Sequence, residues 1–508
     1  MLFTDVVAAS TAVAATRSRK EKVVAIAAAL RRADDAELPV VAGWLAGDPR
    51  QGKIGVGWSL LDEVRLPDDQ MSTATVPTLA VAEIDSLLDD LATARGSGST
   101  ATRVSLLTDV MARATSEEDA FLRRLLIGDL RQGALESLVV DGIAAATETP
   151  ARAARRALML SGDLGATALL ARIGGVEGLD AVQLEVLRPV QPMLAATADD
   201  AGTAVADLGP SSVEWKLDGA RIQAHRSGET VRLYTRNLND ITDRLPEVVA
   251  TVLGFGSRDL VLDGEVIGLD AEARPRAFQD TMSRFGRDDA ASHPATLDGF
   301  FFDVLHLDGV NMIDEPLGDR LDALADVAPD RCVPGIRTDD ADVARAFAAD
   351  AISAGHEGVM VKALDSRYQA GRRGKTWRKV KPVHTLDLVV LAAEWGHGRR
   401  TGWLSNLHLG ARGPDGTFVM VGKTFKGLTD ALLDWQTAEL LAREERRTTH
   451  TVFVRPELVV EIALDGVQRS TRYPGGIALR FARVRGYRDD KRADEADTID
   501  TARALLAR

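Results

Sequence analysis

A lysine flanked by two carboxylates is the feature of this sequence best suited to do chemistry. Lys216 ends a short strand-like run, with Glu214 two residues before it and Asp218 two residues after it. A glycine turn then leads to Arg221. A lysine becomes a nucleophile only where burial or neighbouring cations lower its pKa. The segment therefore indicates either a nucleophilic lysine or a surface hairpin that carries these residues incidentally.

Three further segments place charged side chains at the ends of β-like runs. LDGEV at residues 262–266 carries Glu265, and EGVMVK at residues 357–362 begins with Glu357. In WRKVKP at residues 377–382, Lys379 and Lys381 share one face of a strand, because alternate strand residues point the same way. Each segment also has an ordinary interpretation, as a strand end, a cap or a solvated face. Their occurrence together, in this order, favours a common role over chance.

The elements that must position these residues fall into three parts. The chain has 508 residues, of which 45% are hydrophobic, so it can form several cores. Residues 1–185 show helical apolar spacing, and residues 115–118 fit a capping box. Residues 186–385 mix short β-like runs with helical stretches, and residues 386–508 read as strands with glycine-rich turns. We predict a multi-domain protein: an all-α domain, an α/β (α+β) domain and a C-terminal β-barrel.

Charge and cysteine content restrict the class of protein. The net charge of −13 excludes a simple basic nucleic-acid coat. Locally, however, residues 367–400 contain nine lysines and arginines and only two aspartates and glutamates. Residues 469–492 contain eight lysines and arginines and two aspartates. Such clusters are typical of phosphate contacts and support a DNA partner. The single cysteine, Cys332, cannot form an internal disulfide or a four-cysteine zinc site. With no membrane span or signal peptide in the pattern, we expect a cytoplasmic protein.

The motif series as a whole resembles that of the ATP-dependent DNA ligases, members of a nucleotidyltransferase superfamily that also holds RNA ligases and mRNA capping enzymes. KLDGAR at residues 216–221 is similar to the adenylated-lysine motif of that family. The other matching segments are YTRN (234–237), DGE (263–265), FFDVLHLDG (301–309), EGVMVK (357–362), RGKTWRKVK (373–381) and RFAR (480–483). LRQG (130–133) and VGKTFKG (421–427) extend the resemblance to both flanks, and the likeness is to the three-domain actinobacterial type.

The resemblance implies a role for each candidate residue. Lys216 would attack the α-phosphate of ATP, and Asp218 would orient the 3′-hydroxyl or a metal at the nick. Lys379, Lys381 and bound Mg²⁺ would lower the pKa of Lys216. Glu214 would accept from the adenine amino group, and Phe302 would stack on the adenine ring. Glu265 would accept from a ribose hydroxyl, and ribose and phosphates would be held by Arg221, Arg236 and Arg373. Glu357, together with Glu265, would bind Mg²⁺ or Mn²⁺. Phe302 also has an ordinary interpretation as a core residue.

The implied function is sealing of nicks in duplex DNA through a lysyl-AMP and a DNA-adenylate. Residues 1–185 would bind DNA, residues 186–385 would carry adenylation, and residues 386–508 would form an OB-fold, in a monomer whose substrates are ATP and nicked duplex DNA. An RNA ligase or a capping guanylyltransferase is the first alternative, and the long helical N-terminal part argues against both. A catalytically dead nick-binding protein is the second, and the complete set of charged motif residues argues against it.

Overall fold

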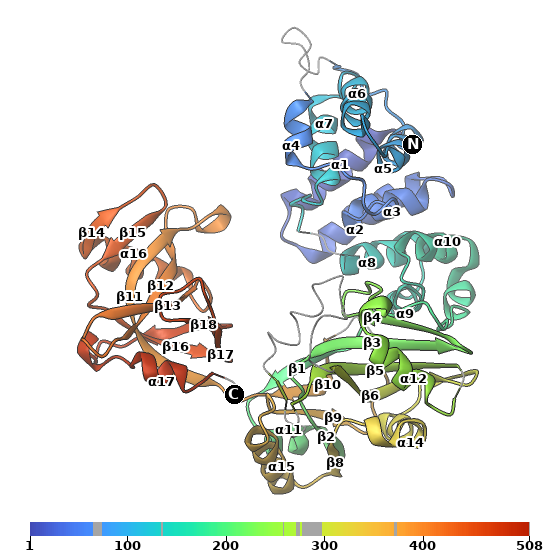
Figure 1. Cartoon of the computed structure of the whole chain (residues 1–508). Coiled ribbons are helices and arrows are strands. Elements are labelled where there is room, and N and C mark those ends of the chain that lie inside the picture. The colour runs from blue at the N-terminus through green and yellow to red at the C-terminus, as the bar shows by residue number, and fades with distance from the viewer. Residues whose placement is uncertain are drawn as a thin grey trace. The chain divides into compact units, whose positions relative to one another are not determined.

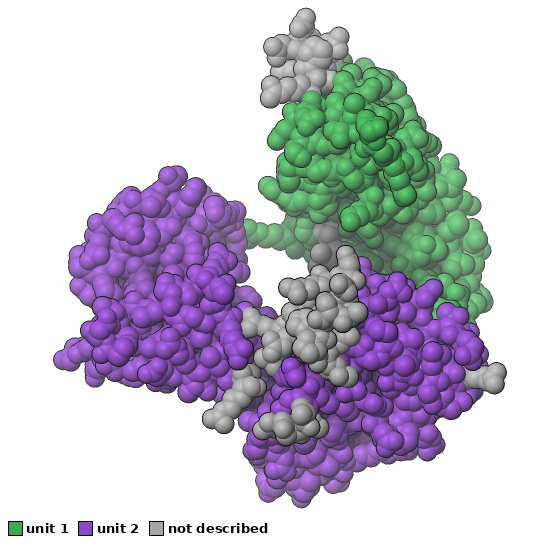
Figure 2. Space-filling model, viewed as in Figure 1, with its two compact units in different colours: residues 1–192 green, residues 193–508 purple. Residues whose placement is uncertain are grey.

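The computed structural model describes residues 1–64, 74–133, 136–257, 259–270, 275–276, 297–369 and 373–506, apart from the side chain of Arg373. The chain divides into two compact units, Met1–Pro192 and Met193–Arg508, which Figure 2 colours separately. No described helix is long and apolar enough to cross a membrane.

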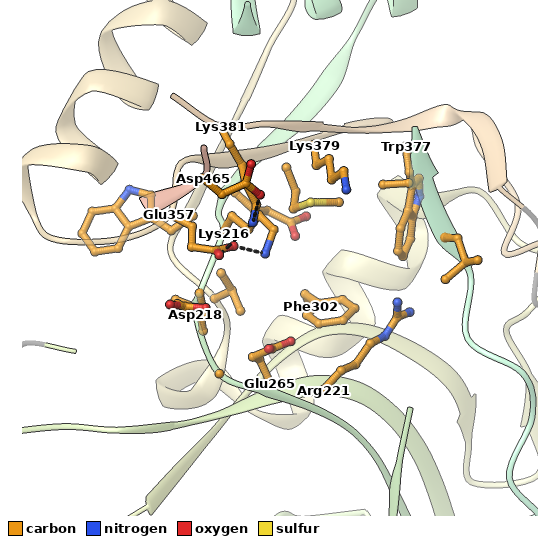
Figure 3. Close-up of a pocket in the computed structure, with 18 of the residues that line it drawn as sticks. Lys216, Asp218, Arg221, Glu265, Phe302, Glu357, Trp377, Lys379, Lys381 and Asp465 are labelled. Carbon is orange, nitrogen blue, oxygen red and sulfur yellow. Dashed lines mark hydrogen bonds and ion pairs between the residues drawn. The ribbon is translucent and has the colours of Figure 1, made fainter. Parts of the chain in front are cut away.

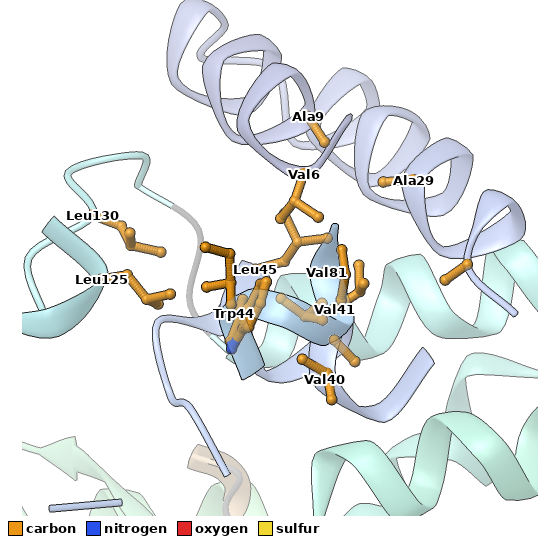
Figure 4. Close-up of a cluster of buried hydrophobic side chains, with 14 of the residues drawn as sticks. Val6, Ala9, Ala29, Val40, Val41, Trp44, Leu45, Val81, Leu125 and Leu130 are labelled. Atoms are coloured by element: carbon orange, nitrogen blue, oxygen red, sulfur yellow. The ribbon is translucent and has the colours of Figure 1, made fainter. Parts of the chain in front are cut away.

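The first unit is helical, as its apolar spacing predicts. Its helices are α1 (Phe3–Ala15), α2 (Arg19–Arg32), α3 (Leu38–Ala46), α4 (Trp58–Glu63), α5 (Val81–Thr93), α6 (Ser99–Met111), α7 (Ser116–Leu126), α8 (Glu136–Thr147), α9 (Ala151–Ser161) and α10 (Leu164–Asp180) (Figure 1). The predicted capping box is confirmed: Thr115 and Glu118 bond each other's main chain at the start of α7. Val6 of α1, Val41 and Trp44 of α3 and Leu125 of α7 converge in the core from three separate helices (Figure 4).

The first part of the second unit contains two sheets, each five-stranded among the described residues. Sheet A has the order β1 (Leu194–Ala198), β10 (Arg373–Val380), β9 (Val359–Ala363), β2 (Ser211–Trp215) and β8 (Gly335–Thr338). Sheet B has the order β4 (Thr230–Thr235), β3 (Ala220–Ser227), β5 (Asp259–Gly268), β6 (Leu297–Leu307) and β7 (Val310–Asn311). The mixed α/β character predicted for this part is therefore confirmed.

Each sheet buries one face against helices, which leaves its other face for polar chemistry. Val213 of β2, Val361 of β9 and Val380 of β10 pack in one core with α11 (Ala201–Leu208) and α15 (Ala341–Ser353). In sheet B, the strand residues of a second core pack with α12 (Pro246–Leu253) and α14 (Leu317–Val327) (Figure 1). Because strand side chains alternate, Ser212 and Glu214 take the face opposite to Val213.

The C-terminal part is rich in β-structure, as predicted. One sheet, seven-stranded among the described residues, pairs β13 (Phe418–Thr424), β12 (Leu404–Arg412), β11 (His384–Trp395), β15 (Thr451–Val454) and β14 (Glu444–Arg447) in that order, with β16 (Val459–Leu464) on β11 and β19 (Arg483–Tyr487) on β16. β17 (Gly466–Arg469) pairs with β18 (Ile477–Arg480), and α16 (Asp430–Ala442) and α17 (Ile499–Arg503) complete this part. These pairings do not close the described strands into a barrel, so the OB-fold stays a prediction.

Candidate active site

A pocket of about 650 Å³ in the second unit collects most of the residues singled out from the sequence. Sheet A and the turns beside it contribute Glu214, Lys216, Asp218, Glu357, Lys379 and Lys381, and sheet B and its turns contribute Arg221, Arg236, Glu265 and Phe302. In Figure 3, Lys216 and Glu357 lie toward one side of the pocket, and Phe302 and Arg221 toward the other. Arg373 begins β10, and its side chain lies outside the described part of the chain.

Lys216 follows β2 directly and is tied to the start of β9 by its main chain. Its N–H donates to Gly358 O at 2.8 Å, and Glu357 N–H donates to Lys216 O at 3.1 Å. The Lys216 ammonium forms an ion pair with the Glu357 carboxylate, which also accepts a 2.7 Å hydrogen bond from Lys381 Nζ (Figure 3). The two motifs therefore meet at the predicted nucleophile.

The charge around Lys216 differs from the expectation drawn from the sequence. Burial would lower the pKa of Lys216, but the nearby Glu357 and Glu265 carboxylates outweigh burial and raise it. Lys381 also pairs with Glu357, but the pKa of Lys216 stays raised in its presence. Among the protein's own groups, then, Lys216 is held as an ammonium, and the predicted lowering of its pKa needs further positive charge.

The two candidate metal ligands are shifted in opposite directions. Burial would raise the pKa of Glu357, but Lys216 and Lys381 outweigh it and hold that pKa well below its ordinary value. For Glu265, burial dominates over the attraction of Lys216 and Arg221, and it raises the pKa to about 7. Glu357 is therefore an ionised carboxylate at neutral pH, whereas Glu265 is close to its titration point.

Arg221 is anchored at the pocket wall by a buried network. Its Nε and Nη2 donate to the two carboxylate oxygens of Asp263 at 2.9 and 2.6 Å, and Nη1 donates to Met193 O at 2.7 Å. Tyr368 donates to Asp263 at 2.6 Å and accepts from Met193 N–H at 3.0 Å. Sequence reasoning assigned no role to Tyr368 or Asp263. Asp263 gave a signal, since it lies two residues before Glu265 on the same strand.

The Phe302 ring, which lies 5.4 Å from the Arg221 guanidinium, also neighbours a buried ion pair. Lys362 Nζ contacts Glu214 Oε2 at 2.5 Å, and Ser212 Oγ donates to Glu214 Oε1 at 2.8 Å. Phe302 faces the pocket, whereas its neighbour Phe301 is fully buried in the core of sheet B. Alternation along β6 therefore puts Phe302 where a ring could stack on it.

The C-terminal part also contributes to this pocket. Arg480, which ends β18, donates to Asp218 Oδ2 at 2.8 Å and to Oδ1 at 3.2 Å. Asp465, which precedes β17, lies 3.6 Å from Lys381 Nζ. Lys426 and Arg483 line the pocket as well. Arg480, Arg483 and Lys426 lie within motifs recognised in the sequence, but none of these four residues was predicted to have a site role.

The carboxylates present suit Mg²⁺ as a partner of bound phosphates. Glu357 and Glu265 line one pocket from different sheets. Among the described residues, no group of three or more His, Cys, Asp or Glu side chains is placed to hold a metal ion by itself. Mg²⁺ commonly takes only one or two carboxylates and completes its shell with phosphate oxygens and water. The donor set therefore fits a metal that binds together with a nucleotide.

Comparison with known proteins identifies the family. The family described as "ATP dependent DNA ligase domain" matches residues 192–381, "ATP dependent DNA ligase C terminal region" matches residues 400–491, and "DNA ligase N terminus" matches residues 63–144. The chain is 55% identical to a probable DNA ligase of Rhodococcus opacus (strain B4), over 100% of both chains. It is 56% identical to a probable DNA ligase of Saccharopolyspora erythraea, over 99% of this chain and 98% of that one.

A solved structure shows the same fold. Pmar-Lig_PreS3 superposes with a TM-score of 0.65 at 20% identity, over 95% of this chain and 99% of that one. The family matches and the relatives covered over their whole length establish that the chain belongs to the ATP-dependent DNA ligases, enzymes that form phosphodiester bonds. The RNA ligase, capping enzyme and dead-scaffold alternatives are not favoured.

Proposed function

We propose that this chain seals nicks in duplex DNA, with Lys216 as the residue that carries AMP between ATP and DNA. The main support is the position of Lys216, which contacts Glu357 in a pocket that Phe302 and Glu214 also line. A nucleotide that stacked on Phe302 would extend its phosphates toward the lysine. The pocket therefore offers a base-binding end and a phosphate-reacting end.

The first step forms the lysyl-AMP. Lys216 Nζ, after losing a proton, attacks the α-phosphorus of ATP; the P–N bond forms as the bond to the β-phosphate oxygen breaks, and pyrophosphate leaves. Since Glu357 and Glu265 raise the pKa of Lys216, the free amine forms readily only when their negative charge is offset. Glu357 and Glu265 would hold Mg²⁺, which when bound supplies positive charge beside the lysine and the phosphates.

The other pocket residues would bind the nucleotide. Phe302 would stack on adenine, and Glu214 would accept from its amino group. The ribose and phosphates would be held by cations and a carboxylate: Arg221, Arg236, Arg373, Lys379, Lys381 and Glu265. Arg221 already gives three hydrogen bonds to Asp263 and Met193. We therefore propose that it contacts the nucleotide without a change in its own side-chain conformation.

The later steps take place at the nick. A 5′-phosphate oxygen of DNA attacks the phosphorus of the lysyl-AMP and releases Lys216; the 3′-hydroxyl then attacks the 5′-phosphorus and releases AMP. Asp218 would orient that hydroxyl or a metal. Both of its oxygens accept from Arg480 here, which fixes the Asp218 carboxylate in the pocket and leaves each oxygen a second lone pair.

We assign the domains in the same scheme. Residues 1–185 form the DNA-binding domain, residues 186–385 the adenylation domain and residues 386–508 an OB-fold, in a chain that works as a monomer. Such an enzyme would contact mainly phosphate and sugar, so its sequence preference would be low.

A nick-joining assay tests the proposal. A duplex with a single nick and a labelled 5′-phosphate is incubated with the full chain, ATP and Mg²⁺, and the product is resolved on a denaturing gel. We expect a joined strand that requires ATP and the 5′-phosphate, and that a matched 5′-hydroxyl nick does not give. Nick binding without any joined product would contradict the proposal.

A further inference from the structure

Lys362 is buried inside the pocket wall and has no assigned role. Its side chain is only 1% exposed, on the pocket-facing side of β9. Its Nζ contacts Glu214 Oε2 at 2.5 Å and donates to Phe302 O at 3.2 Å. It also lies 4.4 Å from the ring centres of both Phe302 and Trp377, within the range of cation–π attraction. All four of these contacts of the Lys362 ammonium are with the protein's own groups.

These contacts fix the Glu214 carboxylate from two sides. Lys362 holds Oε2, and Ser212 Oγ donates to Oε1 at 2.8 Å. The arrangement follows from the sheet, because Ser212 lies directly opposite Lys362 in the pairing of β2 with β9. Each carboxylate oxygen keeps a second lone pair, so Glu214 can still accept a hydrogen bond from a group in the pocket. The ionised Glu214 carboxylate can accept a hydrogen bond from that group but has none to donate.

We infer that Lys362 is a positioning residue for base selection, which fixes Glu214 as an acceptor and makes the pocket prefer a 6-amino purine over a 6-oxo purine. The inference rests on the proposed function, in which Glu214 faces the base. The oxygen of a 6-oxo group and the ionised Glu214 carboxylate are both hydrogen-bond acceptors, so no hydrogen bond could form between them. A free lysine could donate to that oxygen, but Lys362 is committed to Glu214 and to the main chain of Phe302.

Removing the Lys362 ammonium should weaken this selection. A buried carboxylate that loses its cation favours the protonated form, which carries a donor as well as acceptors. A protonated Glu214 would accommodate a 6-oxo group, and an unfixed one would bind the 6-amino group less well. Selectivity should therefore fall even where the lysine nucleophile remains intact.

The test compares ATP with inosine triphosphate, which differs from it at the 6-position. Transfer of α-phosphate label to the full chain is measured with each nucleotide and Mg²⁺, for the unmodified chain and for Lys362→Met. We expect the ratio of kcat/KM for ATP over inosine triphosphate to fall at least about tenfold in the variant, the value of one hydrogen bond to a charged group. An unchanged ratio would overturn the inference.

A second pair of variants covers the case in which Lys362→Met does not fold. The double variant Glu214→Gln with Lys362→Met leaves no unpaired buried charge, and it is compared with Glu214→Gln alone. If Lys362 acts through Glu214, the two should share the same ratio to within about twofold, since the couplings of one contact are not additive. A further tenfold loss in the double variant would overturn the inference.

Arg320→Met is the matched control. Arg320 and Asp303 form another fully buried pair, with both side chains 0% exposed, and neither lines the pocket. We expect this variant to lower stability and to keep the nucleotide ratio; an equal loss of ratio would show general loosening and overturn the inference. Absence of any label from ATP on the unmodified chain would contradict the proposed function, whereas labelling with an unchanged ratio in Lys362→Met contradicts only this inference.

Discussion

Lys216, the proposed nucleophile, and the Glu357 carboxylate hold each other in their charged forms. The Glu357 carboxylate offsets the charge of the buried Lys216 ammonium, and the same pairing opposes release of the free amine. The pair therefore couples the start of the reaction to the arrival of positive charge. Glu357 has two functions in this account, as counter-charge before the reaction and as proposed metal ligand during it.

Replacement of Glu357 separates these functions. In Glu357→Gln the pKa of Lys216 should fall, because its main stabilising carboxylate is gone, and Lys216 should react faster with an amine-modifying reagent at pH 8. Adenylation with Mg²⁺ should nevertheless fall by about 10² or more, since the proposed metal ligand is lost. Modification rate by mass spectrometry and label transfer from ATP provide the two measurements.

The control for this variant is Glu394→Gln. Glu394 is also paired with a lysine, Lys423, and it lies outside the residues that line the pocket. We expect Glu394→Gln to leave both readouts unchanged. Slower modification of Lys216 in Glu357→Gln would contradict the account of its charge.

Ionisation of the buried Glu265 carboxyl should lower the free energy of unfolding as the pH rises toward and through 7. Its carboxyl ionises near pH 4.5 in the unfolded chain and near pH 7 in the folded one, so its contribution to stability is present below pH 4.5 and is lost as the pH rises through 7. Relative to Glu265→Gln, the native chain should lose about 1 to 3 kcal/mol of unfolding free energy between pH 5 and pH 8. Urea denaturation of both chains across this range measures the difference. A difference that does not change with pH would contradict the assigned burial.

At the scale of elements, the site depends on the close approach of β9 and β10. Gly358, between Glu357 and the first residue of β9, has a φ of 137°. A Cβ at this position would overlap Val380 O and lie 3.2 Å from Lys381 Cα. Glycine is therefore what allows Glu357 and Lys381 to meet.

Gly358→Ala should separate the two strands and disturb the Glu357–Lys381 contact. We expect a loss of stability of more than about 2 kcal/mol and a loss of adenylation, because the left-handed backbone and the overlap both oppose a side chain. Thermal denaturation and label transfer from ATP measure the two effects. Gly228→Ala is the control: Gly228 also has positive φ, at 58°, but nothing lies within 4 Å of its added Cβ. Equal effects in both variants would contradict the role of close approach.

Several elements were predictable from the sequence because their patterns are local. The strands that carry Glu214, Glu265 and Lys379 were expected from alternation, and the capping box at Thr115 from four residues. The order of sheet A was not, since β1 pairs with β10 and β9 with β2 across long stretches of chain. Lys362 was missed for the same reason: its partner Glu214 lies on a strand that only the fold brings beside it.

For the whole molecule, charge clustering in the sequence overstates the positive surface of the C-terminal part. Arg488 and Lys491, which belong to the cluster at residues 469–492, both bind Asp387, at 2.9 and 2.5 Å. Arg492 pairs with Asp494 at 2.6 Å. Part of this cluster therefore stabilises the C-terminal part, and fewer of its cations remain for phosphate contacts than the sequence indicates.

The family assignment and the pocket together predict that Lys216 carries AMP. The direct measurement is incubation with ATP labelled at the α-phosphate and Mg²⁺, followed by a denaturing gel, for the native chain, Lys216→Ala and Lys216→Arg. Lys216→Arg keeps a cation beside Glu357, so it separates loss of the nucleophile from loss of the ion pair. We predict label on the native chain alone, released when unlabelled nicked DNA is added. Equal label on either variant, or none on the native chain, would contradict the claim.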